Sequence, residues 1–123
     1  MKTVILLLSL VSPAALLATE KITADYDEAV KTCHVQKKRL PTIRELQHLW
    51  AKKLLSPHHS YWSTTCAIER PNRSGWDYKN GDCATFWKPD FKYRFVMILD
   101  GQGKAKPEDL NSPEVKIAYC VSR

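Results

Sequence analysis

Residues 33–50, CHVQKKRLPTIRELQHLW, decide the fold of this chain. Apolar residues at helical spacing lie on both sides of Leu40-Pro41-Thr42. Pro41 lacks an amide hydrogen and pushes Leu40 toward an extended conformation, so a helix cannot continue through it. Thr42 and Glu45 then have the spacing of a capping box. The stretch therefore predicts two short helices joined by a sharp corner, with Leu40 turned inward between them.

The apolar pattern also predicts the extent of the two helices. The first is expected over about residues 24–37, capped by Asp25 with Glu28 three residues on, while Thr23 is a competing cap. Helical spacing places Cys33 on its buried stripe. The apolar face expected for the second helix consists of Ile43, Leu46, Leu49, Trp50 and Leu54.

Beyond Ser56 the sequence becomes typical of strands and turns. Strands are expected at residues 61–65, 84–87 and 93–99, and a last strand with two unlike faces at residues 115–122. Residues 100–103, Asp-Gly-Gln-Gly, predict a turn, and the segment from there to Pro113 is expected to be a loop. Helices come first and strands follow, which predicts an α+β fold with a mainly antiparallel sheet.

The first 18 residues have the pattern of a secretory signal peptide. Lys2 precedes an apolar run, and small residues lead up to Ala18. An uncleaved membrane anchor is the alternative, but the apolar run is shorter than the ~20 residues that a spanning helix needs. Residues 19–123 are therefore expected to form one exported domain, periplasmic or secreted, with no membrane span after cleavage.

All four cysteines lie in this expected domain: Cys33, Cys66, Cys83 and Cys120. An even number of cysteines in an exported chain predicts disulfides, and four cysteines allow three different pairings. No spacing among them resembles the C-x-x-C of a metal or redox motif. The residues alone leave the pairing open.

Several motifs in order resemble a bacterial domain family named after the C-terminal domain of the collagen-like adhesin Lcl. They are Cys33, RLPTIREL at 39–46, YWSTT at 61–65 and YCVSR at 119–123. The resemblance implies a C-type-lectin-like fold, similar also to the formylglycine-generating enzymes, in which two short helices pack on a twisted antiparallel sheet and the chain ends meet. It further implies a Cys33–Cys120 disulfide, which leaves Cys66–Cys83 across an inserted hairpin or loop.

The stretch from Arg70 to Arg94 alternates cations with aromatic rings. The candidate binding residues are Arg70, Arg73, Trp76, Tyr78, Lys79, Trp87, Lys88 and Lys92. Rings stack on sugars beside cations that meet sulfate or carboxylate, and the same mixture suits a protein interface. The alternative is that the rings fill the core and the cations are solvated. The resemblance favours a glycan, because that adhesin family is associated with sulfated glycosaminoglycans.

The formal charge of +6 fits the same choice of partners. Export makes an anionic glycan or an acidic protein face a better partner than nucleic acid. A charge of this size also often does no more than keep a protein soluble. We therefore expect an adhesin-like binding domain, and the competing hypothesis is an envelope protein-interaction module, such as an accessory subunit or inhibitor, with no glycan ligand. The oligomeric state is left open.

Metal, cofactor and enzyme chemistry are not expected. The neighbours His58 and His59 have no third ligand at a suitable spacing. Residues 77–82 and 87–90 contain oxygen ligands, but Lys79 and Lys88 intrude, so tight turns are favoured over a calcium site. Two disulfides would leave no spare thiol, and no nucleophile and base can be placed together. The sequence thus predicts recognition without catalysis.

Overall fold

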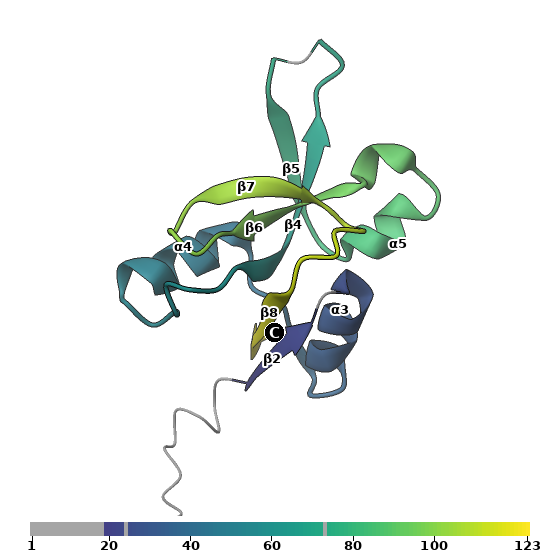
Figure 1. The fold of residues 1–123 in the computed structure, drawn as a ribbon. Helices are drawn as coiled ribbons and strands as arrows, with labels where there is room; N and C mark the ends of the chain where they lie inside the picture. The colour runs from purple at the N-terminus through teal and green to yellow at the C-terminus, as the bar shows by residue number, and fades with distance from the viewer. Residues whose placement is uncertain (1–18, 24, 73) are drawn as a thin grey trace, which may run out of the picture.

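The structure is a computed structural model that describes residues 19–23, 25–72 and 74–123. The expected signal peptide, residues 1–18, and the candidate binding residue Arg73 lie outside the described residues. The elements in chain order are β2 (Thr19–Thr23), α3 (Tyr26–His34), β3 (Lys38–Arg39), α4 (Ile43–Ala51), β4 (Tyr61–Glu69), β5 (Trp76–Asn80), α5 (Cys83–Trp87), the 3₁₀ helix η1 (Phe91–Tyr93), β6 (Phe95–Leu99), β7 (Ala105–Asp109) and β8 (Lys116–Ser122). The described chain is α+β, with three α-helices on a curled mixed sheet (Figure 1).

The strands follow the order β2-β8-β4-β6-β7, with β3 added to β8 and β5 added to β4. Their pairings are antiparallel except where β4 meets β8, at Tyr61 opposite Ile117. Strands β2 and β8 come from the two ends of the described chain and lie side by side (Figure 1). Beyond Tyr61, β4 pairs with β5 while β8 pairs with β3, so the two central strands diverge.

The corner before α4 lies in the space between the diverging strands β4 and β8. The Thr42 hydroxyl accepts from the Glu45 amide at 3.1 Å, and the Glu45 carboxylate accepts from the Thr42 amide at 2.8 Å, which confirms the capping box. Leu40 is 3% exposed, as expected of a side chain turned inward. The Pro41 carbonyl accepts from the Thr64 amide at 2.8 Å and so bonds the corner directly to β4.

Two apolar clusters lie on opposite faces of the sheet. Alternate side chains of a strand point to opposite faces, and in β4 Trp62 joins one cluster while Tyr61 joins the other. The larger cluster also contains residues of α3, α5 and β6. The smaller one is built on Leu46 of α4 and includes Ile117 of β8. Both faces of the central strands are therefore covered by helices.

Two disulfides join distant parts of the chain, in the pairing that the family resemblance implies. Cys33 of α3 bonds to Cys120 of β8 across 87 residues, and Cys66 of β4 bonds to Cys83 at the start of α5 across 17 residues. The chain-entropy model assigns about 4–5 kcal/mol to a loop of the first length and about 3 kcal/mol to the second. The first bridge connects the region of the corner to the end of the chain.

The fully buried Lys116 of β8 joins β8 to β7. Its ammonium group lies 2.7 Å from the Glu108 carboxylate and 4.5 Å from the centre of the Trp62 ring. Burial raises the pKa of Glu108, but hydrogen bonds from Lys116 and Ser112 outweigh it and leave that pKa below its ordinary value. A buried cation is tolerated here because a carboxylate and a ring face compensate its charge.

One strand assignment and one loop assignment made from the sequence are wrong. Residues 84–87, expected to be a strand, belong to the helix α5, because the Asp82 carboxylate caps the turn by accepting from the Thr85 amide. The expected loop before Pro113 contains β7, which pairs with β6. Pro107 hides this strand in the sequence, yet it is compatible with an edge strand whose outer amides make no sheet bonds.

The helix ends also differ from expectation. Helix α3 is shorter than residues 24–37 and is preceded by β2, which the sequence did not predict. Asp25 caps it as expected, but Glu28 accepts from the Thr23 hydroxyl and does not close a box with Asp25. Leu54 is 58% exposed and Leu55 is buried in its place, because α4 ends at Ala51.

The segment between Cys66 and Cys83 is a hairpin, one of the two alternatives expected. Residues 76–80 form β5, where tight turns were favoured, and pair with residues 65–69 of β4. The hairpin projects beyond the rest of the sheet (Figure 1).

Candidate functional site

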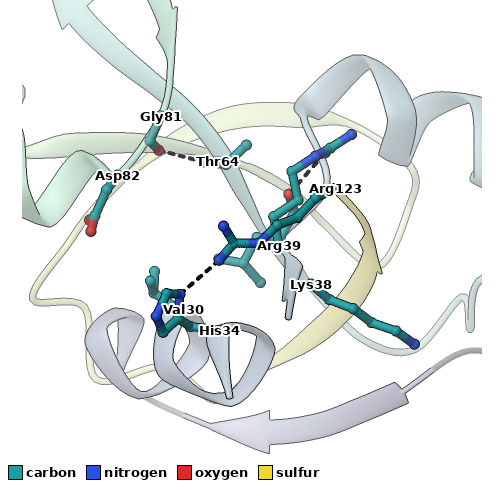
Figure 2. Close-up of a pocket in the computed structure, with 9 residues that line it drawn as sticks. Val30, His34, Lys38, Arg39, Thr64, Gly81, Asp82 and Arg123 are labelled. Carbon is teal, nitrogen blue, oxygen red and sulfur yellow. Dashed lines mark hydrogen bonds between the residues drawn. The ribbon is translucent and has the colours of Figure 1, made fainter. Parts of the chain in front are cut away.

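A hollow of about 460 Å³ opens where β4 and β8 diverge. It is lined by Val30, His34, Lys38, Arg39, Leu40, Thr64, Gly81, Asp82 and Arg123 (Figure 2), and we call it the Leu40 hollow. The lining comes from α3, β3, β4, the turn before α5 and the residue that follows β8. The helix-breaking corner thus places Leu40 in the wall of a cavity whose volume lies in the usual range for ligand pockets.

One cation of this hollow is already neutralised. The Arg39 guanidinium forms two parallel hydrogen bonds with the Glu45 carboxylate, at 2.6 and 2.9 Å. Hydrogen bonds from Arg39 are the main cause that lowers the pKa of Glu45 to about 2, and they also raise the pKa of Arg39. This pair links β3 to the capping box of α4, so its first role is structural.

A second cation, Arg123, bonds to a histidine and to no carboxylate. Its guanidinium lies 2.7 Å from Nδ1 of His34. A guanidinium only donates hydrogen bonds, so Nδ1 accepts and the neutral His34 ring carries its proton on Nε2. Within residues 25–72 and 74–123, no Asp or Glu oxygen lies within ion-pair distance of Arg123. Its charge remains available to a ligand.

The opposite wall of the hollow contains Thr64, Gly81 and Asp82 (Figure 2). The Thr64 hydroxyl donates to the Gly81 carbonyl, and the Gly81 amide donates to the Thr64 carbonyl at 2.9 Å. The Asp82 carboxylate accepts from the Thr85 amide and hydroxyl at 3.2 and 2.9 Å. No Lys, Arg or His of the described chain forms an ion pair with Asp82.

Tyr26 lies close to this wall. Burial is the main cause that raises its pKa, and the charge of Asp82 raises it further, so the phenol stays protonated. Its buried hydroxyl has no hydrogen-bond partner of good geometry. The ring packs edge-on against Trp62, with the ring centres 5.3 Å apart. Tyr26 therefore belongs to the core rather than to the hollow.

The basic aromatic stretch forms a second, separate cleft. This basic cleft has a volume of about 240 Å³ and is lined by Glu69, Arg70, Pro71, Lys92, Arg94 and Phe95. The Arg94 guanidinium lies 4.6 Å from the ring centre of Phe91 and 4.6 Å from that of Phe95. Arg70 is paired with Asp77 at 3.0 Å and Lys92 with Asp90 at 3.5 Å. Arg94 has no such carboxylate partner in the described parts of the chain.

The structure brings only part of the expected binding set together at the basic cleft. Arg70 and Lys92 line it, and Trp76 is next to it, with its ring centre 5.4 Å from that of Phe95. Tyr78 is exposed beside a different hollow, close to the start of α4.

The remaining candidates lie elsewhere. The Lys79 ammonium lies 4.3 Å from the ring centre of Phe86. Trp87 and Lys88 line a small hollow with Asp25 at the start of α3. The seven described candidates therefore do not form one surface, because adjacent β5 residues point to opposite faces and residues 83–87 turn away as a helix.

Sequence reasoning placed Arg94 in the basic aromatic stretch but not among the candidate binding residues, and it missed the Leu40 hollow. Arg94 ends the basic aromatic stretch, but only the 3₁₀ turn η1 brings Phe91 back beside it. His34, Asp82 and Arg123 are far apart in the chain and carry no common motif. No local pattern indicates that they would line one cavity.

The described residues contain no cluster of three or more His, Cys, Asp or Glu side chains able to hold a metal ion. His58 and His59 are exposed in the loop before β4. In residues 19–23, 25–72 and 74–123, no helix has the length and apolar character needed to cross a membrane. Comparison of the sequence with protein-family models and with curated proteins found no match.

Proposed function

We propose that this chain is an exported, non-catalytic binding domain of C-type-lectin-like architecture that recognises an anionic glycan at the basic cleft. The observation that carries the proposal is the position of Arg94, whose guanidinium contacts two aromatic rings and no carboxylate among the described residues. Arg70 and Lys92 line the same cleft, each within ion-pair distance of an aspartate.

The packing of Arg94 suits it to bind a sulfate or a carboxylate. A planar guanidinium offers hydrogen-bond donors in a fork that matches these anions. Contact with Phe91 and Phe95 holds this fork in place before a ligand arrives, which lowers the ordering cost of binding. Phe91 is 65% exposed and offers a ring face on which a sugar can stack. Charge and ring together fit an acidic sugar better than a neutral one.

Other features support the remaining parts of the proposal. Two disulfides favour an oxidising compartment, such as the periplasm or the outside of the cell. The pairing of β2 with β8 and the bridge from α3 to β8 agree with the architecture that the resemblance implies. The corner at Leu40 fits the same architecture.

The test is a binding measurement with heparin, chemically desulfated heparin and neutral dextran, at low and at physiological salt. We expect selective binding of heparin that weakens steeply with salt, because exposed charges are screened over about 10 Å at 0.1 M salt. Arg94→Gln should weaken binding about tenfold, a loss of about 1.4 kcal/mol. Arg44→Gln, on the exposed face of α4, is the matched control and should bind as the wild type does.

Equal binding by the two variants would place the glycan site elsewhere. If the wild type binds none of the three polysaccharides, the result would favour the second candidate function, a protein-interaction module. Tyr78 is the observation that supports this alternative, because it is a 58% exposed tyrosine beside a hollow of about 420 Å³. Tyrosine is enriched at interface hot spots, and a complex with an apolar centre should weaken little with salt.

A further inference from the structure

The Leu40 hollow shares no lining residue with the basic cleft and has a different charge pattern. Lys38 has an interaction of its own and its side chain points away from the open space (Figure 2), whereas Arg123 and Asp82 form no ion pair in the described chain. They lie across the open space from each other (Figure 2), on segments that are brought together only by the fold. A cavity with one free charge of each sign favours a ligand that also carries both signs.

The other lining residues further define which ligand the hollow can bind. Val30 and Leu40 add apolar atoms to the lining of the hollow. The backbone and hydroxyl groups of Thr64 and Gly81 already bond to each other. The Arg39 guanidinium is occupied by Glu45. A ligand therefore finds the Arg123 guanidinium and the Asp82 carboxylate as charged partners on these walls, together with the apolar atoms of Val30 and Leu40.

We infer that the Leu40 hollow binds a small zwitterion, an α-amino acid or a short peptide, with its carboxylate on Arg123 and its ammonium group on Asp82. The Asp82 carboxylate has lone pairs left after capping α5, because each oxygen accepts one bond from Thr85 and can accept another. A simple anion is less well suited, since Asp82 would repel it. An aliphatic side chain of the ligand packs on Val30 and Leu40.

The experiment is a titration of the isotopically labelled, oxidised protein with L-leucine and with L-leucyl-L-leucine, followed by amide NMR shifts. Shifts are expected at residues around the hollow, such as Leu40, Thr64 and Gly81. N-acetyl-L-leucine lacks the ammonium group and L-leucinamide lacks the carboxylate. Each should bind about tenfold more weakly than leucine, because one charge contact of about 1.4 kcal/mol is lost.

Two variants assign the ends of the ligand. Arg123→Gln should weaken leucine binding about tenfold and abolish the preference for leucine over leucinamide. Asp82→Asn should also weaken leucine binding about tenfold, and it should abolish the preference for leucine over N-acetyl-leucine. Asparagine caps helices as aspartate does, so this variant should retain α5. Arg44→Gln, outside the hollow, should bind all probes as the wild type does. The heparin assay on the same variants keeps this result separate from that of the basic cleft.

Absence of shifts with both zwitterions would overturn the assignment, as would shifts that map away from the hollow. Equal affinity for leucine, N-acetyl-leucine and leucinamide would show that Arg123 and Asp82 do not bind the charged ends of the ligand. Retention of the full preference by Arg123→Gln or Asp82→Asn would likewise contradict the proposed contacts.

Discussion

The corner at residues 39–46 and the segment between Cys66 and Arg94 differ in what holds them. The corner is bonded on several sides, through its capping box, the Arg39–Glu45 pair and the Pro41 carbonyl on β4. The second segment is a projecting hairpin and a five-residue helix that one disulfide ties to β4. Local bonds and burial make the corner a rigid support, whereas the second segment offers exposed rings and cations for recognition.

Removal of each disulfide is the strongest way to test this difference. Cys33→Ala with Cys120→Ala should cost about 4–5 kcal/mol of unfolding free energy, because the bridge closes nearly the whole described chain. Cys66→Ala with Cys83→Ala should cost about 3 kcal/mol, since its loop is shorter. Denaturant unfolding of both double variants measures the two values. A larger loss from the second pair would mean that the hairpin segment is the main support of the fold.

Single truncations in the two regions should differ as clearly. Leu40→Ala removes a side chain that is 3% exposed and should destabilise the protein by about 2–5 kcal/mol, through lost apolar contacts and a cavity. Phe91→Ala removes a 65% exposed ring and should change stability by about 0.5 kcal/mol or less. Thermal or denaturant unfolding compares them.

In the heparin assay the ranking of these two variants should be reversed, with the larger loss of binding in Phe91→Ala. Phe91→Ala removes a ring that contacts the Arg94 guanidinium, so we expect weaker glycan binding with nearly unchanged stability. Leu40→Ala should bind heparin normally wherever it is folded. If Phe91→Ala unfolds the protein, the ring supports the fold, and its proposed role as a solvent-exposed recognition residue would be contradicted.

A smaller effect should appear in acid, at the corner alone. The pKa of Glu45 is about 2 in the folded chain against its ordinary value of 4.5, so the folded state binds a proton less readily than the unfolded state. The stability that this pair contributes is therefore present above the ordinary pKa and is lost as pH falls through about 2. Because the pair is partly exposed, solvent reduces the effect.

Unfolding by denaturant from about pH 5 to about pH 2 measures this contribution when the wild type is compared with Glu45→Gln. Glutamine keeps the capping-box geometry but cannot titrate. The wild type should lose more stability than the variant over this range. Parallel curves would show that the Arg39–Glu45 pair contributes nothing measurable at the corner.

The two regions also differ in how well they could be predicted from the sequence. At the corner, Pro41 and the Thr42–Glu45 spacing act within a few residues, so the break, the cap and the inward Leu40 are confirmed. In the second segment, β-branched and aromatic residues suggested a strand at 84–87, but the Asp82 cap and the disulfide at Cys83 produce α5. The conformation of a short segment held by distant contacts depends more on those contacts than on the strand or helix propensity of its own residues.

The sequence by itself determined the α+β class, the break between two short helices, the buried position of Cys33 and the presence of a basic aromatic stretch. Each of these depends on residues that are neighbours in the chain. The tertiary structure alone decided which of the candidate residues meet, because strand register and the divergence of β4 from β8 are non-local. It placed Phe91 and Phe95 against Arg94, and it placed Arg123 across a cavity from Asp82.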